Sequence, residues 1–402
     1  MKKVVIIGGG YAGVYALKEL SKNKDIHITL LDKHTYHNLQ PEVYDFIANK
    51  ADFADVTIDL STLCAGFNHP NLHFYNKRVI NCDFEKKVVI CSNKEAFEYD
   101  YLLLAMGART NFPKSIEGLN NTDDIKKLHR ALHFKQSFEI DMFAKIENEM
   151  QKCEDSHIVV VGAGLSGVEI AAEMAHFSTK FFKSGQFACD NMRISLISGS
   201  GEILPGMNET IVQMSRKRLE DLGINIITGA HMDSCDEQCV HLSNGNKLPY
   251  SFIIFAGGIE AANLTSKFNL PKNKKGQLLV DEYLQVKNLS GVFAAGDVSV
   301  IHDDKGEPMP PNVTVARESG TIAAKNISSL IANEPMCECK PFIEGTLIAL
   351  GGKYAVCNLY DKINVKGFIG YLIKQYVFYR YKLPLQKISR NGYKKFKNRC
   401  QS

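Results

Sequence analysis

The sequence predicts an α/β protein with two similar strand–turn–helix units and a distinct C-terminal segment. A Gly-x-Gly-x-x-Gly motif occurs twice, each time directly after a β-branched apolar run. Its glycines are Gly8, Gly10 and Gly13 in the first copy and Gly162, Gly164 and Gly167 in the second. Such glycines let the backbone turn tightly and approach a pyrophosphate at a helix N-terminus. We therefore expect an α/β fold with two Rossmann-like dinucleotide-binding domains, the second inserted in the first, plus a C-terminal amphipathic membrane-associating region.

Length and composition fit this expectation. A chain of 402 residues that is 45% hydrophobic can form two to three globular domains with ample core. No apolar run reaches the length of about 18 residues that a spanning helix needs. Because the first strand is expected to begin at residue 2, we expect no signal peptide and a cytoplasmic protein. The 11 cysteines are scattered and odd in number, which favours reduced thiols.

The first nucleotide domain continues with a strand over residues 26–32 that ends in Asp32. An acidic residue at this place meets the ribose hydroxyls of a bound dinucleotide, although a solvated strand-end carboxylate is the alternative. Residues 88–91 and 101–105 are further strand candidates, the latter leading into a turn of small residues. Residues 123–152 carry apolar side chains at helical spacing and link the two domains.

The second nucleotide domain is expected to use residues 193–198 as its second strand, after an insertion at 177–191. A strand over 248–255 then ends in Ala256-Gly257-Gly258, and a strand at 292–295 ends in Gly296-Asp297. We expect the chain to return to the first domain before this last strand. The expected boundaries are 1–154 and 273–340 for the first domain, 155–272 for the second, and 341–402 for the C-terminal region.

The C-terminal region combines basic, aromatic and amphipathic character. Residues 362–402 contain 11 Lys and Arg and no Asp or Glu, whereas the rest of the chain has a net charge of −7. After a strand and turn at 345–352, residues 365–383 place apolar side chains largely on one side of a helix. This pattern is typical of a helix lying in an anionic membrane interface. The alternative is a helix that docks on the body with a solvated basic face.

These motifs together resemble the flavoproteins of the pyridine nucleotide-disulfide oxidoreductase superfamily, and most closely the type II NADH:quinone oxidoreductases, over nearly the whole chain. The segment from Tyr36 to Tyr44 is similar to the family's segment beneath the flavin, and Ala295-Gly296-Asp297 is similar to its second FAD motif. The resemblance implies FAD contacts at Gly8, Gly10, Gly13, Asp32, His37, Gln40, Ala105, Gly107, Gly296 and Asp297. It implies nicotinamide-nucleotide contacts at Gly162, Gly164, Gly167, Gly257 and Gly258.

The resemblance also implies a reaction. Hydride would pass from NADH or NADPH to FAD, and electrons would then leave to a membrane quinone without proton pumping. Glu169 would lie near the flavin–nicotinamide contact and orient the nicotinamide or relay a proton, unless it is only a helix N-terminal acid favoured by the macrodipole. Thr314 and Glu318 would line the acceptor side. The implied location is the cytoplasmic face of the inner (plasma) membrane, with a homodimer as a further expectation and no nucleic-acid partner.

Two departures from the family pattern concern the two substrates. Thr314 and Glu318 stand where the family carries two glutamines after its proline pair. Ser198 stands where a carboxylate normally ends the second strand of the nicotinamide domain. Serine neither holds the ribose hydroxyls bidentately nor repels a 2′-phosphate. Glu202 could substitute, the site could accept NADPH, or nicotinamide binding could be lost.

Two other classes of function remain open from the sequence. One is a sulfide:quinone oxidoreductase-like enzyme, in which Cys153 and Cys357 are the one pair that could serve near the flavin, or another flavin reductase with a non-quinone acceptor. The pairs Cys235 with Cys239 and Cys337 with Cys339 lack the usual two-residue spacing of metal sites, so we expect no metal. A non-catalytic flavoprotein that uses its basic tail is the other alternative.

Overall fold

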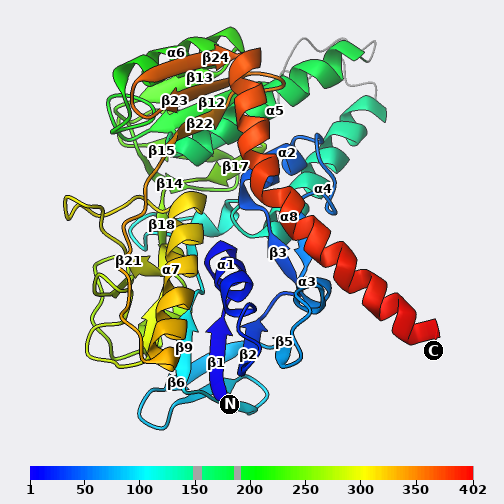
Figure 1. The fold of residues 1–402 in the computed structure, drawn as a ribbon. Coiled ribbons are helices and arrows are strands. Elements are labelled where there is room, and N and C mark those ends of the chain that lie inside the picture. Colours follow the sequence, from blue (N-terminus) through cyan, green and yellow to red (C-terminus); the bar gives the residue numbers. More distant parts are fainter. Residues whose placement is uncertain (148–155, 185–191, 402) are drawn as a thin grey trace.

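The computed structural model describes residues 1–147, 156–184 and 192–401, and it has the expected α/β architecture (Figure 1). A five-stranded parallel sheet carries the first glycine motif, in the order β20-β9-β1-β2-β5. Its strands are β1 (Lys2–Ile7), β2 (Ile26–Asp32), β5 (Leu72–Asn76), β9 (Tyr101–Leu104) and β20 (Val292–Ala294). Because β20 pairs with β9 after the whole second unit has intervened, the predicted insertion of one domain in the other is confirmed.

A four-stranded parallel sheet carries the second glycine motif, in the order β13-β12-β11-β17. Its strands are β11 (His157–Val161), β12 (Arg193–Ser198), β13 (Asn225–Thr228) and β17 (Phe252–Phe255). The single strand predicted over 248–255 is wrong. β16 (Lys247–Pro249) pairs antiparallel with β15 (Cys239–Leu242) beside β14 (Met232–Cys235), whereas β17 is parallel to β11. The chain has to turn between these two pairings.

The helices cover the sheets and connect the two units. The first unit has α1 (Tyr11–Leu20), α2 (Val43–Ile47), α3 (Leu60–Gly66) and α7 (Val313–Ala332), and the second has α5 (Leu165–Ser184) and α6 (Glu209–Asp221). Helix α4 (Leu128–Glu147) leads from the first unit to the second, as predicted, although residues 148–152 of that prediction lie outside the described residues. Helices α1 and α7 lie side by side (Figure 1).

Short elements complete the two units. In the first they are β3 (Tyr36–Asn38), η1 (Gln40–Glu42), β4 (Thr57–Asp59), β6 (Val79–Asp83), β7 (Val88–Cys91), β8 (Ala96–Glu98), β19 (Leu278–Leu279), η5 (Gly296–Val298) and β21 (Ser299–Val300). Near the junction lie β10 (Ala108–Thr110), η2 (Leu119–Asn121), β18 (Ile259–Ala261) and η4 (Asn263–Lys267). The antiparallel pair β10–β18 joins the two units directly.

The C-terminal region forms a three-stranded antiparallel sheet and one long helix. The strands are β22 (Gly345–Ala349), β23 (Ala355–Leu359) and β24 (Ile363–Gly367), and the helix is α8 (Phe368–Gln401). The helix predicted over 365–383 is therefore wrong at both ends. Its first residues pair with β23 as part of β24, and Gly367 ends that strand with a φ of +77°. The helix then continues through Pro384 to residue 401.

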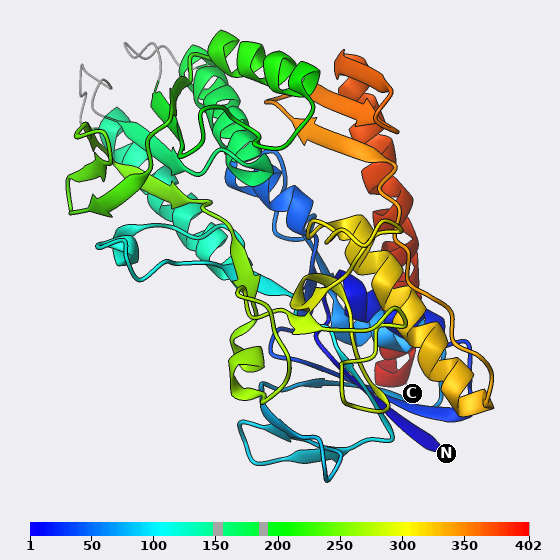
Figure 2. The same ribbon diagram turned by 90° about the vertical axis from the view of Figure 1, so that its left-hand side faces the viewer.

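Helix α8 runs from the three-stranded sheet down the side of the first unit (Figures 1 and 2). Its C-terminal half packs on α3 through two glycines. A Cβ at Gly392 would lie 1.8 Å from the Thr62 carbonyl oxygen, and one at Gly66 would lie 1.9 Å from that of Ile388. Half of α8 is thus a docked helix. Among the described residues, no helix combines the length and the apolarity that crossing a membrane requires.

Candidate nucleotide and acceptor sites

The first glycine motif forms an open cradle between β1 and α1. Gly8 has a φ of +110°, and a Cβ there would lie 2.3 Å from the carbonyl oxygen of Ala105, at the end of β9. Gly13 approaches Gly8 so closely that its Cβ would lie 1.8 Å from the Gly8 carbonyl oxygen. A Cβ at Gly10, by contrast, would meet nothing within 4 Å. Free backbone N–H groups and open space at a helix N-terminus fit a phosphate group.

Asp32 is held against this cradle at the end of β2. Its carboxylate accepts hydrogen bonds from the backbone N–H of Gly9 at 2.6 Å and of His34 at 2.7 Å. The structure therefore brings Asp32 and the first glycine turn together, as the ribose-binding prediction requires.

Two buried polar atoms beside the cradle lack partners. His37 is fully buried, and its Nδ1 lies 2.9 Å from the Gly9 carbonyl oxygen, to which it can donate. Its ring meets the Tyr11 ring edge-on at 4.8 Å. Within the described residues, neither His37 Nε2 nor the Tyr11 hydroxyl has a hydrogen-bond partner. Burial lowers the pKa of His37 to about 4, so the ring is neutral. Unpaired buried polar atoms at an open cradle fit a polar ligand.

The other residues predicted to bind FAD lie around the same edge of the sheet. Gln40 begins η1, and its Oε1 accepts a hydrogen bond from Asn38 Nδ2 at 3.0 Å. Asp297 in η5 forms an ion pair with Lys126 at 3.5 Å. The adjacent Gly296 donates its N–H to Ser319 on α7 at 3.0 Å. Sequence reasoning missed Lys126, because no motif marks a lysine that precedes its partner by 171 residues.

The second glycine motif repeats the geometry of the first. A Cβ at Gly162 would lie 2.5 Å from the Ala256 carbonyl oxygen, as Gly8 does with Ala105, and Gly167 packs on Gly162 as Gly13 does on Gly8. A Cβ at Gly164 would again meet nothing within 4 Å. The following glycine turn, Gly257-Gly258, stands at the end of β17, beside this cradle.

The two cradles are linked through the β10–β18 pair. The Asn111 N–H donates to the Gly258 carbonyl at 3.0 Å, and the Ala262 N–H donates to the Gly107 carbonyl at 3.1 Å. Gly107 and Gly258 therefore flank one connection between the units. Both have positive φ, and a Cβ at either would meet nothing within 4 Å.

Glu169 on α5 is tied to the C-terminal region. Its Oε1 accepts hydrogen bonds from Lys374 Nζ on α8 at 2.6 Å and from the Ala349 N–H at 2.8 Å. Burial lowers the pKa of Lys374, but the Glu169 carboxylate, together with Asp45 and Glu173, outweighs this effect, and the pKa lies above its usual value. Both side chains of the pair are largely buried. The sequence placed Lys374 among the basic residues of a membrane helix and gave no sign of this pairing.

A second ion pair, with a buried carboxylate and a more exposed lysine, lies one helical turn further along α5. Glu173 is fully buried and bonds Lys50 Nζ at 2.8 Å, while Lys50 also pairs with Asp45 at 2.6 Å. Glu173 accepts a further bond from the Gly352 N–H at 3.3 Å. Burial raises the pKa of Glu173. Because these groups come from the first unit, the second unit and the C-terminal sheet, they hold the three parts together.

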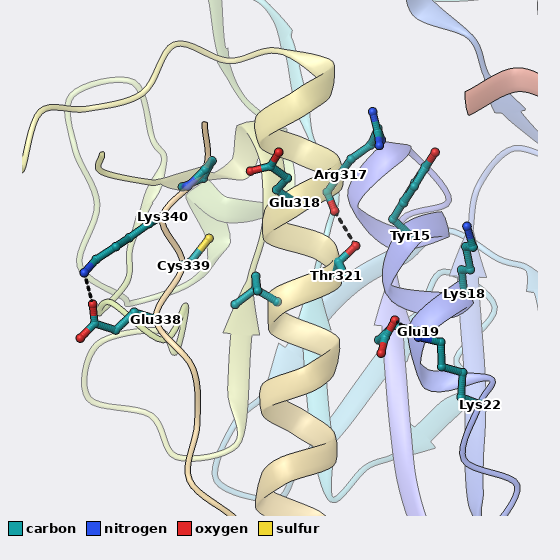
Figure 3. A pocket seen from close by; sticks show the side chains of 12 residues that line it. Tyr15, Lys18, Glu19, Lys22, Arg317, Glu318, Thr321, Glu338, Cys339 and Lys340 are labelled. Atoms are coloured by element: carbon teal, nitrogen blue, oxygen red, sulfur yellow. Dashed lines mark hydrogen bonds and ion pairs between the residues drawn. The ribbon is translucent and has the colours of Figure 1, made fainter. Parts of the chain in front are cut away.

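The two residues predicted to line the acceptor side are on α7. Thr314 is half-buried in the first turn, where Asn312 caps the helix by accepting the Val315 N–H at 2.8 Å. Glu318 accepts the Phe342 N–H at 3.1 Å and lines a cavity of about 510 Å³. In Figure 3 it points toward Cys339 and Lys340, on the side of α7 away from α1.

The end of β12, where the sequence predicts discrimination between NADH and NADPH, differs from a free carboxylate site. Ser198 is buried and donates to the Glu202 carbonyl oxygen at 2.8 Å. The Glu202 carboxylate accepts the Ile203 N–H at 2.7 Å and is bound by the Arg216 guanidinium, with Nε at 3.0 Å. Hydrogen bonding to Arg216 lowers the pKa of Glu202. Glu202 therefore faces Arg216.

The described cysteines are free thiols with unremarkable partners. Cys235 donates to the Gly118 carbonyl at 2.9 Å, and buried Cys357 donates to the Gly370 carbonyl at 3.3 Å. Burial raises the pKa of Cys357 to about 11, which makes it a weak nucleophile. Cys153 lies outside the described residues. In the part of the chain that the structure describes, no group of three His, Cys, Asp or Glu could hold a metal.

Comparison with known proteins agrees with this architecture. Residues 2–320 match the family model described as pyridine nucleotide-disulphide oxidoreductase. A type II NADH:quinone oxidoreductase of Haemophilus influenzae is 26% identical over 394 residues, covering 90% of this chain and 88% of the relative. One from Staphylococcus aureus is 25% identical and covers 90% of each chain.

Solved structures show the same fold. NDH2 from Plasmodium falciparum, solved with NADH, superposes with a TM-score of 0.84 at 21% identity, over 98% of this chain and 97% of that one. The sulfide:quinone oxidoreductase of Aquifex aeolicus superposes with a TM-score of 0.79 at 18% identity, over 97% and 92%. The predicted likeness to type II NADH:quinone oxidoreductases is confirmed, and the chain belongs to the pyridine nucleotide-disulphide oxidoreductase family.

Proposed function

We propose that this protein is a FAD-dependent oxidoreductase that passes electrons from NADH or NADPH through the flavin to a membrane quinone, without pumping protons. The observation that carries the proposal is the pair of matching glycine cradles whose ends are joined by β10–β18. Two dinucleotides held this way bring their reactive rings toward one junction. Relatives named type II NADH:quinone oxidoreductase support the choice of donor and acceptor.

The first cradle fits FAD. The open N-terminus of α1 at Gly10 would hold the pyrophosphate, Asp32 would accept from the ribose hydroxyls, and Asp297 would accept from the ribityl chain. The unpaired Tyr11 hydroxyl and His37 Nε2 are further contacts available to the cofactor. FAD supplies the two-electron redox chemistry when bound, and the protein supplies orientation and exclusion of water.

The second cradle, at Gly164, would hold the pyrophosphate of the nicotinamide nucleotide in the same way. Glu169 would orient the polar edge of the nicotinamide or relay a proton. The bonds from Lys374 and Ala349 fix the direction of its carboxylate, which favours this orienting role. Thr314 and Glu318 would line the acceptor side. Thr314 lies in the first turn of α7, and Glu318 lines the cavity beside that helix.

Contact with an anionic membrane is proposed for the exposed face of α8. Six large apolar side chains with exposed fractions from 47% to 69% recur there at helical spacing. They are Phe368, Ile369, Leu372, Tyr376, Tyr379 and Leu383. Together with the unbroken positive charge of residues 362–402, this face suits the cytoplasmic surface of the inner membrane. A homodimer interface is the alternative use of the same face.

The domain boundaries that accompany this proposal are 1–154 and 273–340 for the FAD-binding domain, 155–272 for the nicotinamide-binding domain, and 341–402 for the membrane-associating region. The sheet to which each strand belongs supports this division.

Cofactor content and donor choice test the proposal. We expect purified protein to carry non-covalent FAD, which heat or acid releases, and its absorbance to bleach anaerobically with NADH or NADPH. Asp297→Ala should retain less FAD and still fold. Protein without a flavin spectrum that gains none on adding FAD contradicts the proposal. Bleaching by sulfide alone would favour the sulfide:quinone alternative, and no bleaching by any donor would favour a non-catalytic flavoprotein.

A further inference from the structure

A buried carboxyl that the proposed reaction has not yet used lies beside the first cradle. Glu42 ends η1 and is only 8% exposed. Within the described residues, its carboxyl group forms neither a hydrogen bond nor an ion pair. Its oxygens are not among the fully enclosed atoms that lack a partner, so water or a ligand can reach them, although taking the group out of bulk water costs free energy.

Titratable and charged groups from each neighbouring element face Glu42. They are Tyr11 from α1, Asp45 from α2, Lys50 just after α2, and Lys374, Tyr381 and Lys382 from α8. The Tyr11 and Tyr381 rings meet edge-on at 6.0 Å, and both are buried. The Tyr11 hydroxyl has no partner within the described residues. Glu42 therefore lies in a polar cluster between the FAD cradle and the Glu169–Lys374 pair.

The Glu42 carboxyl is suited to exchanging a proton near neutral pH. Burial raises its pKa to about 7, and the nearby Asp45 adds to the rise, while Lys382, Lys374 and Lys50 oppose it. A group whose pKa lies near the working pH is populated in both forms and can donate and regain a proton in each cycle.

Polar side chains connect this cluster to the open cavity of Figure 3. The Arg317 guanidinium lies 4.8 Å from the Tyr15 ring centroid and 5.5 Å from that of Tyr381. Tyr15 and Arg317 both line the cavity (Figure 3). Arg317 Nε is buried and unpaired among the described residues, as is the Tyr11 hydroxyl. Ordered water is the usual partner of such atoms, and it would complete a path from solvent.

We propose that Glu42 delivers to the quinone the proton that its reduction takes from solution. The proposal rests on the proposed function. Reduction by NADH follows NADH + quinone + H⁺ → NAD⁺ + quinol, in which one C–H bond of the nicotinamide breaks and two O–H bonds of the quinol form. Neutral Glu42 supplies the H⁺ to a quinone oxygen, becomes a carboxylate, and is reprotonated through the Tyr381–Arg317 side. On this proposal the quinone ring lies on the α8 side of the first cradle, within reach of Glu42.

The test compares acceptors that differ in their need for protons. Enzyme reduced with NADH under anaerobic conditions is mixed with a short-chain quinone, which takes up protons, or with ferricyanide, which takes up electrons alone. For Glu42→Gln we expect reoxidation by quinone to slow on the order of 10²-fold, with its pH dependence near pH 7 lost. Reduction by NADH and reoxidation by ferricyanide should match the wild type. Glu42→Asp should recover part of the quinone rate.

Glu344→Gln is the matched control, because it removes an exposed carboxylate that also pairs with α8, through Arg380. It should behave as the wild type. Equal slowing with both acceptors, or an unchanged quinone rate in Glu42→Gln, would overturn the proposal.

A second readout does not depend on turnover. The infrared band of a protonated carboxylic acid should titrate near pH 7 in the wild type and be missing in Glu42→Gln. Wild-type enzyme that ferricyanide reoxidises but quinones do not would refute the proposed function, and quinone protonation by Glu42 with it. The infrared titration would then still decide whether Glu42 is a proton-exchanging group.

Discussion

At the scale of single residues, the chain places several ionisable groups where burial works against their charge. Glu42 is the clearest case, since its pKa is raised to about 7 from 4.5. A carboxyl whose folded pKa exceeds its unfolded value binds more protons in the folded state. The folded state therefore loses stability as pH rises from about 4.5 to about 7.

Glu42→Gln should remove this dependence. Relative to the variant, the wild type should lose about 3 kcal/mol of unfolding free energy between pH 4.5 and pH 8. Urea unfolding of both proteins across this pH range measures it. If the unfolding free energies of the two proteins change in parallel with pH, Glu42 titrates in the folded protein as it does in the unfolded chain.

The Glu169–Lys374 pair gives a second prediction at this scale. Removing one member of a buried pair leaves the other uncompensated, so Lys374→Met should cost about 3 kcal/mol of stability. The double variant Glu169→Gln/Lys374→Met should lose less unfolding free energy than the two single variants lose together. A double-mutant cycle by urea unfolding measures the coupling, and strict additivity would contradict it.

Stopped-flow mixing with NADH should show slower flavin reduction or proton release in Glu169→Gln, with FAD still bound.

Nucleotide choice also depends on single side chains. With Ser198 in place of a carboxylate and Glu202 bound to Arg216, neither ribose binding nor phosphate repulsion is strong. The lost carboxylate–ribose bond corresponds to about 1.5–3 kcal/mol, so we expect NADH and NADPH to differ by about ten- to a hundred-fold or less in kcat/KM. A preference beyond about a thousand-fold would mean that another residue has taken over discrimination.

At the scale of elements, α8 combines docking and exposure. Its C-terminal half packs on α3, while Lys374 in its N-terminal part pairs with Glu169. Deleting residues 363–402 would remove β24 and both contacts, and would destabilise the protein as well as release it from a membrane. Substitutions on the exposed face separate the two effects.

Ile369→Ser with Tyr376→Ser should weaken binding to anionic vesicles about tenfold or more and leave stability nearly unchanged, because both side chains are exposed. Ile140→Ser with Phe143→Ser on α4 is the control, with two comparably exposed side chains. Co-sedimentation at low and high salt measures the binding. Wild-type protein that stays in the supernatant at low salt would remove the membrane proposal and favour a dimer or docking role.

The sequence predicts the elements that repeat a local rule and misses those set by distant contacts. The two strand–glycine–helix units are predictable, because in each of them a β-branched run is followed directly by the glycine motif. In the first copy, the backbone of Gly8 lies close to the carbonyl oxygen of Ala105. The start of α8 was misplaced because pairing of β24 with β23 overrides its helical pattern. The partners of Glu169 and Asp297 were not predicted, since Lys374 and Lys126 reach them from other elements.

At the scale of the whole molecule, three parts meet at charged groups, most of which are buried. The first unit contributes Lys50 and Glu42, the second contributes Glu169 and Glu173, and α8 contributes Lys374. The antiparallel β10–β18 pair joins the two units that carry the cradles. On the proposed function, the two cradles hold the two dinucleotides, and the acceptor binds on the α8 side of the first cradle.

The central claim is electron transfer from a nicotinamide nucleotide to a quinone through one bound flavin. Anaerobic double mixing tests it most directly: the enzyme is first reduced with one equivalent of NADH and then mixed with quinone in anionic vesicles. We expect flavin absorbance to return fully, with one quinol formed per NADH. Flavin that stays bleached in the presence of quinone, while ferricyanide restores its absorbance, would contradict electron transfer from the flavin to quinone.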